Sequence, residues 1–265
     1  QGRLDLPQFV LATFNAKESF LMPYKMLALD LDNTLLYKDL TMAPAAGAAL
    51  ARLMSRGIFV TLATGRMYPS AAYYAKLAGV TGPLACYNGA LIQSAQPGGY
   101  RLARPLSVEK ARDIAAFCRR KQYYVQLYNN DRILVEKRTK ETEIDPDLIH
   151  NSCVEIGDLT QAEYGPTPKM IVVAPPERTA GIRQEFEEEF GESVPLAASK
   201  DYLVEIMDKG VSKASALAII CQNLGIQPEE VVCCGDNSND AAMIQWAGLG
   251  AAVGNAAPAI KQIAD

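Results

Sequence analysis

Two carboxylates stand two residues apart where a short apolar run ends. Asp30 and Asp32 follow Met-Leu-Ala-Leu at 26–29, a run typical of a strand that is buried on both faces. Side chains two residues apart on extended backbone project the same way. A turn at the end of the strand is an alternative interpretation of this pair alone, because Asp favours turns. Two such carboxylates can also supply a nucleophile and a proton donor.

Two further polar segments lie where a strand is expected to end or a helix to begin. Thr64–Arg66 follows the apolar run 58–63, and its hydroxyl and backbone N–H groups could hold an anion. Lys213 comes one residue after the helix-capping Ser212, where a cation opposes the helix dipole and needs an anion or solvent beside it. Taken singly, these segments could also be a simple strand-to-helix turn and an exposed lysine.

A fourth segment, Gly235–Asp240, places two carboxylates and two amides in one loop after the apolar run 231–234. Repulsion disfavours such crowding unless a cation or hydrogen-bond donors are near. Together the four segments offer the groups that phosphoryl transfer needs: a nucleophile, an acid–base group, anion-binding groups and carboxylates for a magnesium ion. Their positions agree, since ligands of doubly wound folds bind outside the carboxyl ends of the strands.

Strands and helices are expected to alternate around these segments. Strands are expected at 26–30, 58–63, 84–87, 231–234 and 249–253, and helices at 43–56, 69–78, 212–224 and 239–247. Gly57, Gly79 and Gly225 stand where a left-handed helix cap belongs. This alternation predicts an α/β fold with a doubly wound, Rossmann-like parallel sheet.

The middle of the chain has a different pattern. Helices are expected at 107–120 and 177–190, a strand at 170–174, and hairpins from 123–128 with 132–136 and from 194–198 with 202–207. This predicts an α+β domain on an antiparallel sheet, inserted into the α/β core. We expect a core of 22–94 plus 208–265 and an inserted domain of 95–207. Residues 1–21 show no clear periodicity, and we expect them to be a leader or a remnant outside the fold.

The motifs together resemble those of the haloacid dehalogenase-like phosphohydrolase superfamily. The spacing and the inserted domain resemble its Cof-type branch, which has a large α/β cap. The matching stretches are 27–36, 61–66, 86–92, 210–217, 235–243 and 252–256, so the resemblance covers about 22–265. Asn33 stands where many members have glycine, and because Asn tolerates turn geometry we expect no loss of activity.

The resemblance implies a mechanism. Asp30 would attack phosphorus and form an aspartyl-phosphate, and Asp32 would protonate the leaving oxygen and then activate water. Lys213 would offset the negative charge, and we expect Asp30 to stay ionised near Mg²⁺ and Lys213, because opposite charges depress the pKa of a carboxylate. The implied phosphate-binding residues are Thr64, Gly65, Lys213 and Asn239. The implied Mg²⁺ ligands are Asp30, Asp236 and the backbone carbonyl of Asp32, while Asn88 and Arg66 would line the substrate and Asp240 would orient Lys213 or a metal-bound water.

The function implied is a Mg²⁺-dependent phosphatase of small phosphomonoesters such as sugar phosphates. A phosphotransferase or phosphomutase that uses the same intermediate, and a non-catalytic phosphate-binding regulatory module, are the alternatives. Retention of both Asp30 and Asp32 argues against the module, since a binder needs no acid–base group. Candidates for substrate contacts in the cap are Tyr123, Tyr124, Tyr128, Arg138 and Lys169, although a Tyr-rich hairpin is more often packing.

Composition narrows the remaining choices. The chain has 265 residues, a net charge of −4 and 49% hydrophobic residues, which argues against disorder and gives no sign of nucleic-acid binding. No apolar run is long enough to span a bilayer, and a single His excludes zinc sites that need two imidazoles. The six Cys lack C-x-x-C spacing, so we expect reduced thiols in a cytoplasmic monomer or homodimer whose partner is a small phosphorylated metabolite.

Overall fold

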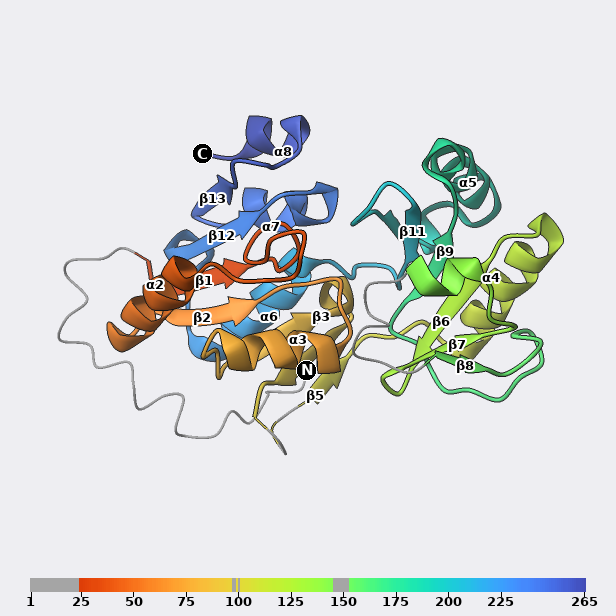
Figure 1. Ribbon diagram of the computed structural model, residues 1–265, viewed down its shortest axis with the longest axis horizontal. Helices are drawn as coiled ribbons and strands as arrows, with labels where there is room; N and C mark the ends of the chain where they lie inside the picture. The colour runs from red at the N-terminus through yellow and green to blue at the C-terminus, as the bar shows by residue number, and fades with distance from the viewer. Residues whose placement is uncertain (1–23, 97–98, 100, 145–152) are drawn as a thin grey trace. The chain divides into compact units, whose positions relative to one another are not determined.

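The computed structural model describes residues 24–96, 99, 101–144 and 153–265 (Figure 1). They form two compact units, which divide between residues 102 and 103 and between 211 and 212; the short segment Arg66–Ser70 belongs to the second unit. The predicted leader at 1–21 lies outside the described residues. All six Cys are free thiols, and five of them are buried.

A four-stranded parallel sheet forms the centre of the first unit. Its strands, in the order β13-β12-β1-β2, are Leu249–Ala252, Val231–Gly235, Met26–Leu29 and Phe59–Leu62. Met26 of β1 lies opposite Val231 of β12 and Phe59 of β2, so these strands end at one edge of the sheet. Residues that follow β1, β2 and β12 are therefore brought together.

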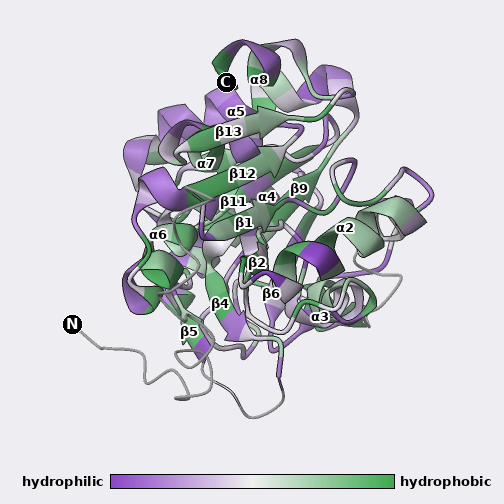
Figure 2. Ribbon diagram, turned by 90° about the vertical axis from the view of Figure 1, so that its left-hand side faces the viewer, coloured by the Kyte–Doolittle hydropathy of each residue, from purple (hydrophilic) through white to green (hydrophobic). Residues whose placement is uncertain are grey.

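Helices cover both faces of this sheet (Figure 2). The helices of the first unit are α2 (Pro44–Ser55), most of α3 (Tyr68–Leu77), α6 (Lys213–Leu224), α7 (Ala241–Trp246) and α8 (Pro258–Ile263). Small side chains of the sheet such as Ala28 let α6 pack closely through Leu217 and Ile220, in a cluster that Met243 of α7 joins. This arrangement confirms the predicted α/β core.

The predicted third strand departs from its expected place. The strand β3 (Pro83–Cys86) pairs antiparallel with β4 (Leu91–Ser94), in a separate sheet of order β3-β4-β5 that β5 (Arg101–Ala103) completes. A single parallel bridge, Ala63 with Ala85, joins β3 to the end of β2. The cause is the tight turn η1 (Tyr87–Gly89), which reverses the chain and makes β4 possible.

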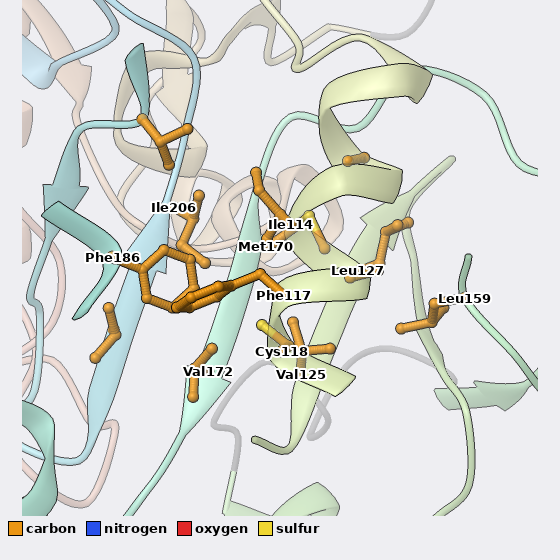
Figure 3. Packing of buried hydrophobic residues seen from close by; sticks show 14 of the residues in the cluster. Ile114, Phe117, Cys118, Val125, Leu127, Leu159, Met170, Val172, Phe186 and Ile206 are labelled. Atoms are coloured by element: carbon orange, nitrogen blue, oxygen red, sulfur yellow. The ribbon is translucent and has the colours of Figure 1, made fainter. Parts of the chain in front are cut away.

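The second unit is a six-stranded sheet with two helices on one face. The strand order is β10-β11-β9-β6-β7-β8, and the strands are Leu196–Ala197, Leu203–Ile206, Met170–Val173, Val125–Asn129, Arg132–Val135 and Cys153–Glu155. The helices α4 (Val108–Lys121) and α5 (Pro176–Phe190) meet through the rings of Phe117 and Phe186, whose centroids lie 4.8 Å apart (Figure 3). Both predicted hairpins are present.

One strand makes this second sheet mixed instead of purely antiparallel. The strand β8 runs parallel to β7 and was not predicted, because its three residues are too few to show a period. Short 3₁₀ turns complete the two units: η2 (Lys140–Ile144), η4 (Gly191–Ser193), η5 (Pro228–Glu230) and η6 (Ser238–Asp240).

The turn η1 packs directly against the start of α6. Tyr87 and Asn88 both have positive φ angles, +51° and +54°, which bulky residues rarely adopt. A Cβ atom at Gly89 would lie 2.2 Å from the carbonyl oxygen of Ser212, far inside van der Waals contact. Glycine at this position is therefore required for the backbone of η1 to approach α6.

We predict that Gly89→Ala destabilises the protein by roughly 1–3 kcal/mol more than Gly225→Ala, because the methyl group must push α6 away. Gly225 is a matched control, since it has a positive φ angle but open space around its Cβ position. Both losses are measured as free energies of unfolding in urea. Equal losses in the two variants would contradict the close packing.

Candidate active site

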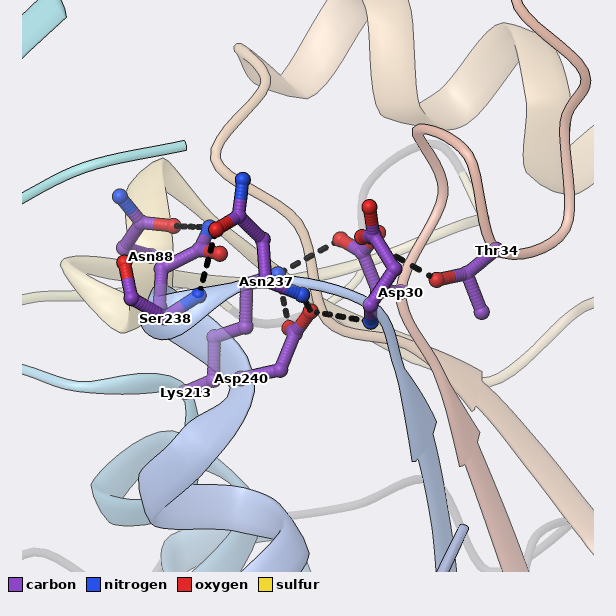
Figure 4. Close-up of polar contacts among 9 residues, drawn as sticks. Asp30, Thr34, Asn88, Lys213, Asn237, Ser238 and Asp240 are labelled. Atoms are coloured by element: carbon purple, nitrogen blue, oxygen red, sulfur yellow. Dashed lines mark hydrogen bonds and ion pairs between the residues drawn. The ribbon is translucent and has the colours of Figure 1, made fainter. Parts of the chain in front are cut away.

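Lys213 is the centre of the polar site in the first unit. Its side chain is fully buried, and its Nζ donates to Asp30 Oδ1 and to Asp240 Oδ1 at 2.6 Å each (Figure 4). Ser212 fixes the start of the helix, because its Oγ accepts from the backbone N–H of Ser215. Two carboxylates thus supply the anions that a lysine in this first turn needs.

Asp240 is held by donors on both of its oxygens. Oδ1 accepts from Lys213, and Oδ2 accepts from the backbone N–H groups of Asp236 (2.9 Å) and Asn237 (3.1 Å). Gly235 makes the approach possible, since a Cβ atom there would lie 2.5 Å from Asp240. The crowding seen in the sequence is therefore relieved by N–H groups and one ammonium, and Asp240 is fixed in place.

Asp30 and Asp236 are the carboxylates of this cluster that could donate oxygen to a cation, because both oxygens of Asp240 already accept from protein donors. One oxygen from each of Asp30, Asp236 and Asp240 lies within 4.8 Å of the others, and Asp240 is already occupied by its donors. Asp236 Oδ1 accepts a long hydrogen bond of 3.4 Å from Thr34. Carboxylate oxygens suit Mg²⁺, which usually keeps several waters and needs few protein ligands. The residues present fit that ion.

Burial controls the protonation of these groups. It raises the pKa of Asp30 well above the usual range. Lys213 lowers this pKa, as expected, but its effect is smaller than that of burial. Burial, followed by the charge of Asp240, also raises the pKa of Asp236 to about 6. Burial lowers the pKa of Lys213, but Asp240 and Asp30 together raise it above its ordinary value. The cluster therefore holds more negative charge than Lys213 offsets.

The predicted phosphate and substrate residues form a second group in this unit. Asn239 Nδ2 donates to Asn88 Oδ1 at 3.1 Å, and the backbone N–H of Asn88 donates to the carbonyl of Thr64 at 2.9 Å. Thr64 is buried and Gly65, beside it, is half-buried. The end of β2, the turn η1 and the turn η6 are thus connected.

Arg66 has a different setting. It is buried, its Nη1 donates to Ser70 Oγ at 2.9 Å, and both residues belong to the second unit. Its place along the substrate stays a prediction, as does the backbone carbonyl of Asp32 as a metal ligand. The charge of Asp32 contributes to the raised pKa of Asp30 and of Asp236, so its carboxylate lies near both.

Two residues of the site were not singled out from the sequence. Thr34 contacts Asp236, and Asn255 Nδ2 donates to the carbonyl of Asn33 at 2.8 Å. Asn33 itself has a φ angle of +59°, the turn conformation that Asn tolerates in place of glycine. Both missed residues lie inside the motif stretches, so the stretches located them although their residue types alone did not.

The cap candidates divide into packing and polar groups. Tyr123 packs against the ring of Phe117, which agrees with the packing interpretation. Arg138 Nη2 donates to the carbonyl of Cys153. Tyr128 and Lys169 are almost fully buried and lie together, with the Lys169 ammonium 4.6 Å from the centre of the Tyr128 ring.

Comparisons with known proteins agree with this site. The model of the haloacid dehalogenase-like hydrolase family matches residues 27–265. The 5-amino-6-(5-phospho-D-ribitylamino)uracil phosphatase YitU of Bacillus subtilis is 30% identical over 92% of this chain and 91% of its own. The HMP-PP phosphatase of Serratia proteamaculans is 25% identical over 91% of this chain and 87% of its own.

A solved structure shares the fold. The crystal structure of a haloacid dehalogenase-like hydrolase from Bacteroides thetaiotaomicron is 26% identical, has a TM-score of 0.80, and matches 91% of this chain and 92% of its own. Among the helices that the structure describes, none is long and apolar enough to cross a membrane. The chain therefore belongs to the haloacid dehalogenase-like hydrolase family, which confirms the predicted superfamily and the predicted class of enzyme, a phosphoric monoester hydrolase.

Proposed function

We propose that this protein hydrolyses small phosphomonoesters through an aspartyl-phosphate formed on Asp30, with Mg²⁺ as its cofactor. The observation that carries the proposal is the buried Lys213 ammonium shared by Asp30 and Asp240 at 2.6 Å each, with Asp236 beside them. A nucleophile, a fixed cation and a further carboxylate in one place suit phosphoryl transfer.

The proposed reaction has two steps. An oxygen of Asp30 attacks phosphorus, the bond to the leaving oxygen breaks, and Asp32 gives that oxygen its proton. Asp32 then takes a proton from water, whose oxygen attacks the phosphorus and frees Asp30 and inorganic phosphate. Lys213, Thr64 and Asn239 hold the phosphoryl oxygens, and the Asn88 amide orients Asn239. The covalent step splits a difficult hydrolysis into two easier ones.

The cofactor would be held by Asp30 and Asp236. When bound, Mg²⁺ would supply positive charge to the phosphoryl oxygens and to a cluster that contains more carboxylate groups than ammonium groups. Burial, and after it the charge of Asp240, raise the pKa of Asp236, so its charged form is disfavoured until a cation binds. Asp240 keeps Lys213 in place through its own backbone donors.

The substrate class proposed is a phosphorylated small metabolite, of the kind that the names of the relatives describe. YitU is named for a phosphate carried on a ribitylamino group. Transfer of the phosphoryl group to an added sugar alcohol in preference to water would instead favour the phosphotransferase or mutase alternative.

We predict that Asp30→Asn lowers kcat for phosphate release by about a thousandfold or more, because the amide is a poor nucleophile. Phosphate release is measured from an aryl phosphate and from a panel of sugar phosphates, with and without Mg²⁺. Asp39→Asn is the matched control, since Asp39 is an exposed carboxylate in the same loop that bonds to Thr41. An active Asp30→Asn protein, or turnover by the wild type without a divalent ion, would contradict the proposal.

We also predict that Mg²⁺ affinity falls at least about tenfold for each pH unit below the Asp236 pKa of about 6. The raised pKa means that the charged carboxylate is disfavoured in the folded, metal-free protein, so protons compete with the cation as the pH falls. Calorimetric titration of the wild type with Mg²⁺ over this range measures the effect. Asp236→Asn is expected to bind weakly at every pH, and a wild-type affinity that does not change across pH 6 would contradict the assignment.

A further inference from the structure

The loop between β13 and α8, residues 253–257, contacts two of the loops that carry the proposed catalytic groups. The backbone N–H of Ala257 donates to the carbonyl of Asp236 at 2.9 Å. The side chain of Asn255 reaches the other loop, where its Nδ2 donates to the carbonyl of Asn33 at 2.8 Å. The loop after β13 therefore connects the loop after β12 with the loop after β1.

Packing holds Asn255 in a defined place. Its neighbour Ala256 is 5% exposed and belongs to an apolar cluster with Ile244 of α7 and Ile260 of α8. The backbone N–H of Ala256 donates to the carbonyl of Val253 at 2.9 Å, which closes a tight turn around Asn255. A side chain on such a well-packed turn is held more precisely than one on a loosely packed loop.

The carbonyl that this amide binds comes one residue after Asp32. Asn33 has a φ angle of +59°, so the chain turns sharply just beyond the proposed acid. The backbone N–H of Leu36 donates to the carbonyl of Leu31 at 2.8 Å, which closes this turn without using the carbonyl of Asn33. The Asn255 amide therefore supports the turn from a second loop.

The nucleophile is held by contacts of its own. The backbone N–H of Asp30 donates to the carbonyl of Cys234 in the neighbouring strand at 3.0 Å, and Lys213 donates to its carboxylate at 2.6 Å. Neither contact involves the loop after β13. Loss of the Asn255 amide should therefore shift Asp32 while Asp30 stays in place.

We propose that Asn255 is a positioning residue for Asp32. Its amide holds the turn at Asn33 so that the Asp32 carboxyl group meets the leaving oxygen of the substrate. Such a contact needs a heavy-atom distance of about 2.6–3.2 Å, so even a small shift of the turn slows proton transfer. The inference rests on the proposed function, in which Asp32 is the acid of the first step and the base of the second.

The substrates differ in how much they need this acid. The p-nitrophenolate ion is a good leaving group and departs without a proton, so the first step with p-nitrophenyl phosphate does not depend on Asp32. The alkoxide of a sugar is a poor leaving group and must be protonated as its bond to phosphorus breaks. The second step needs the base with either substrate.

The test compares Asn255→Asp with the wild type in the presence of Mg²⁺. The aspartate has the shape of asparagine, but its carboxylate cannot donate to the carbonyl of Asn33. Stopped flow measures the first release of p-nitrophenolate, and steady-state kinetics measure the turnover of a sugar phosphate. We expect the first release to slow less than about twofold, while kcat for the sugar phosphate falls about tenfold with little change in KM.

Equal falls in the two rates, or no fall for the sugar phosphate, would overturn the inference. Equal falls would mean that Asn255 acts on Asp30 or on the cation site instead of on Asp32. Asn255→Ala removes the donor without adding a charge, and it should show the same difference between the two rates. It decides the question if Asn255→Asp unfolds below the temperature of the assay.

Asn223 offers a matched control in the same unit. Its Nδ2 donates to the carbonyl of Ile219 at 2.7 Å, near the end of α6 that lies farthest from Lys213. Asn223→Asp loses the same kind of hydrogen bond and should keep the wild-type ratio of the two rates. A ratio changed as in Asn255→Asp would indicate a general loss of structure and would contradict a specific role for Asn255.

The two proposals fail in different ways. A wild-type protein that releases phosphate from neither kind of substrate contradicts the proposed function. A wild-type protein that hydrolyses both, together with Asn255 variants that slow neither or slow both equally, leaves the proposed function standing and overturns the positioning role alone.

Discussion

The buried ammonium of Lys213 is the interaction on which the active-site edge depends. A charge with no exposed surface needs opposite charge in direct contact, since an unpaired buried charge is strongly destabilising. Asp30 comes from the end of β1, and Asp240 comes from the turn after β12. The same two contacts that make the lysine tolerable therefore fix the ends of two strands and the start of α6.

The carboxylates around Lys213 differ in how fully hydrogen-bond donors and positive charge compensate their negative charge. Asp240 receives an ammonium and two backbone N–H groups, so its charge is compensated within the protein. Asp30 and Asp236 have raised pKa values, because burial and neighbouring carboxylates disfavour their charges. An added cation would be most stabilising where compensation is incomplete, which supports the proposed roles of Asp240 in positioning and of the other two in metal binding.

Local signals in the sequence predicted the site better than they predicted the pairing of strands. Apolar runs that end in Asp30 and Asp236 predicted both the parallel strands and the carboxylates at their common edge. The turn at Asn88-Gly89 was visible as a strand end, but the antiparallel partner β4 depends on tertiary contacts that no short pattern records. The motifs predicted the effect of Lys213 on the pKa of Asp30 in the right direction, but they could not show the extent of burial, which raises this pKa by more.

The two polar clusters differ in their charge balance. The cluster at Lys213 has surplus negative charge, so a substitution there alters the charge balance around the proposed nucleophile Asp30. The cluster in the sheet of the second unit contains the buried pair of Lys169 and Glu205, 3.3 Å apart, whose charges balance each other. Exchanging one hydrogen-bonding side chain for another in this neutral cluster leaves the charges around Asp30 unaltered.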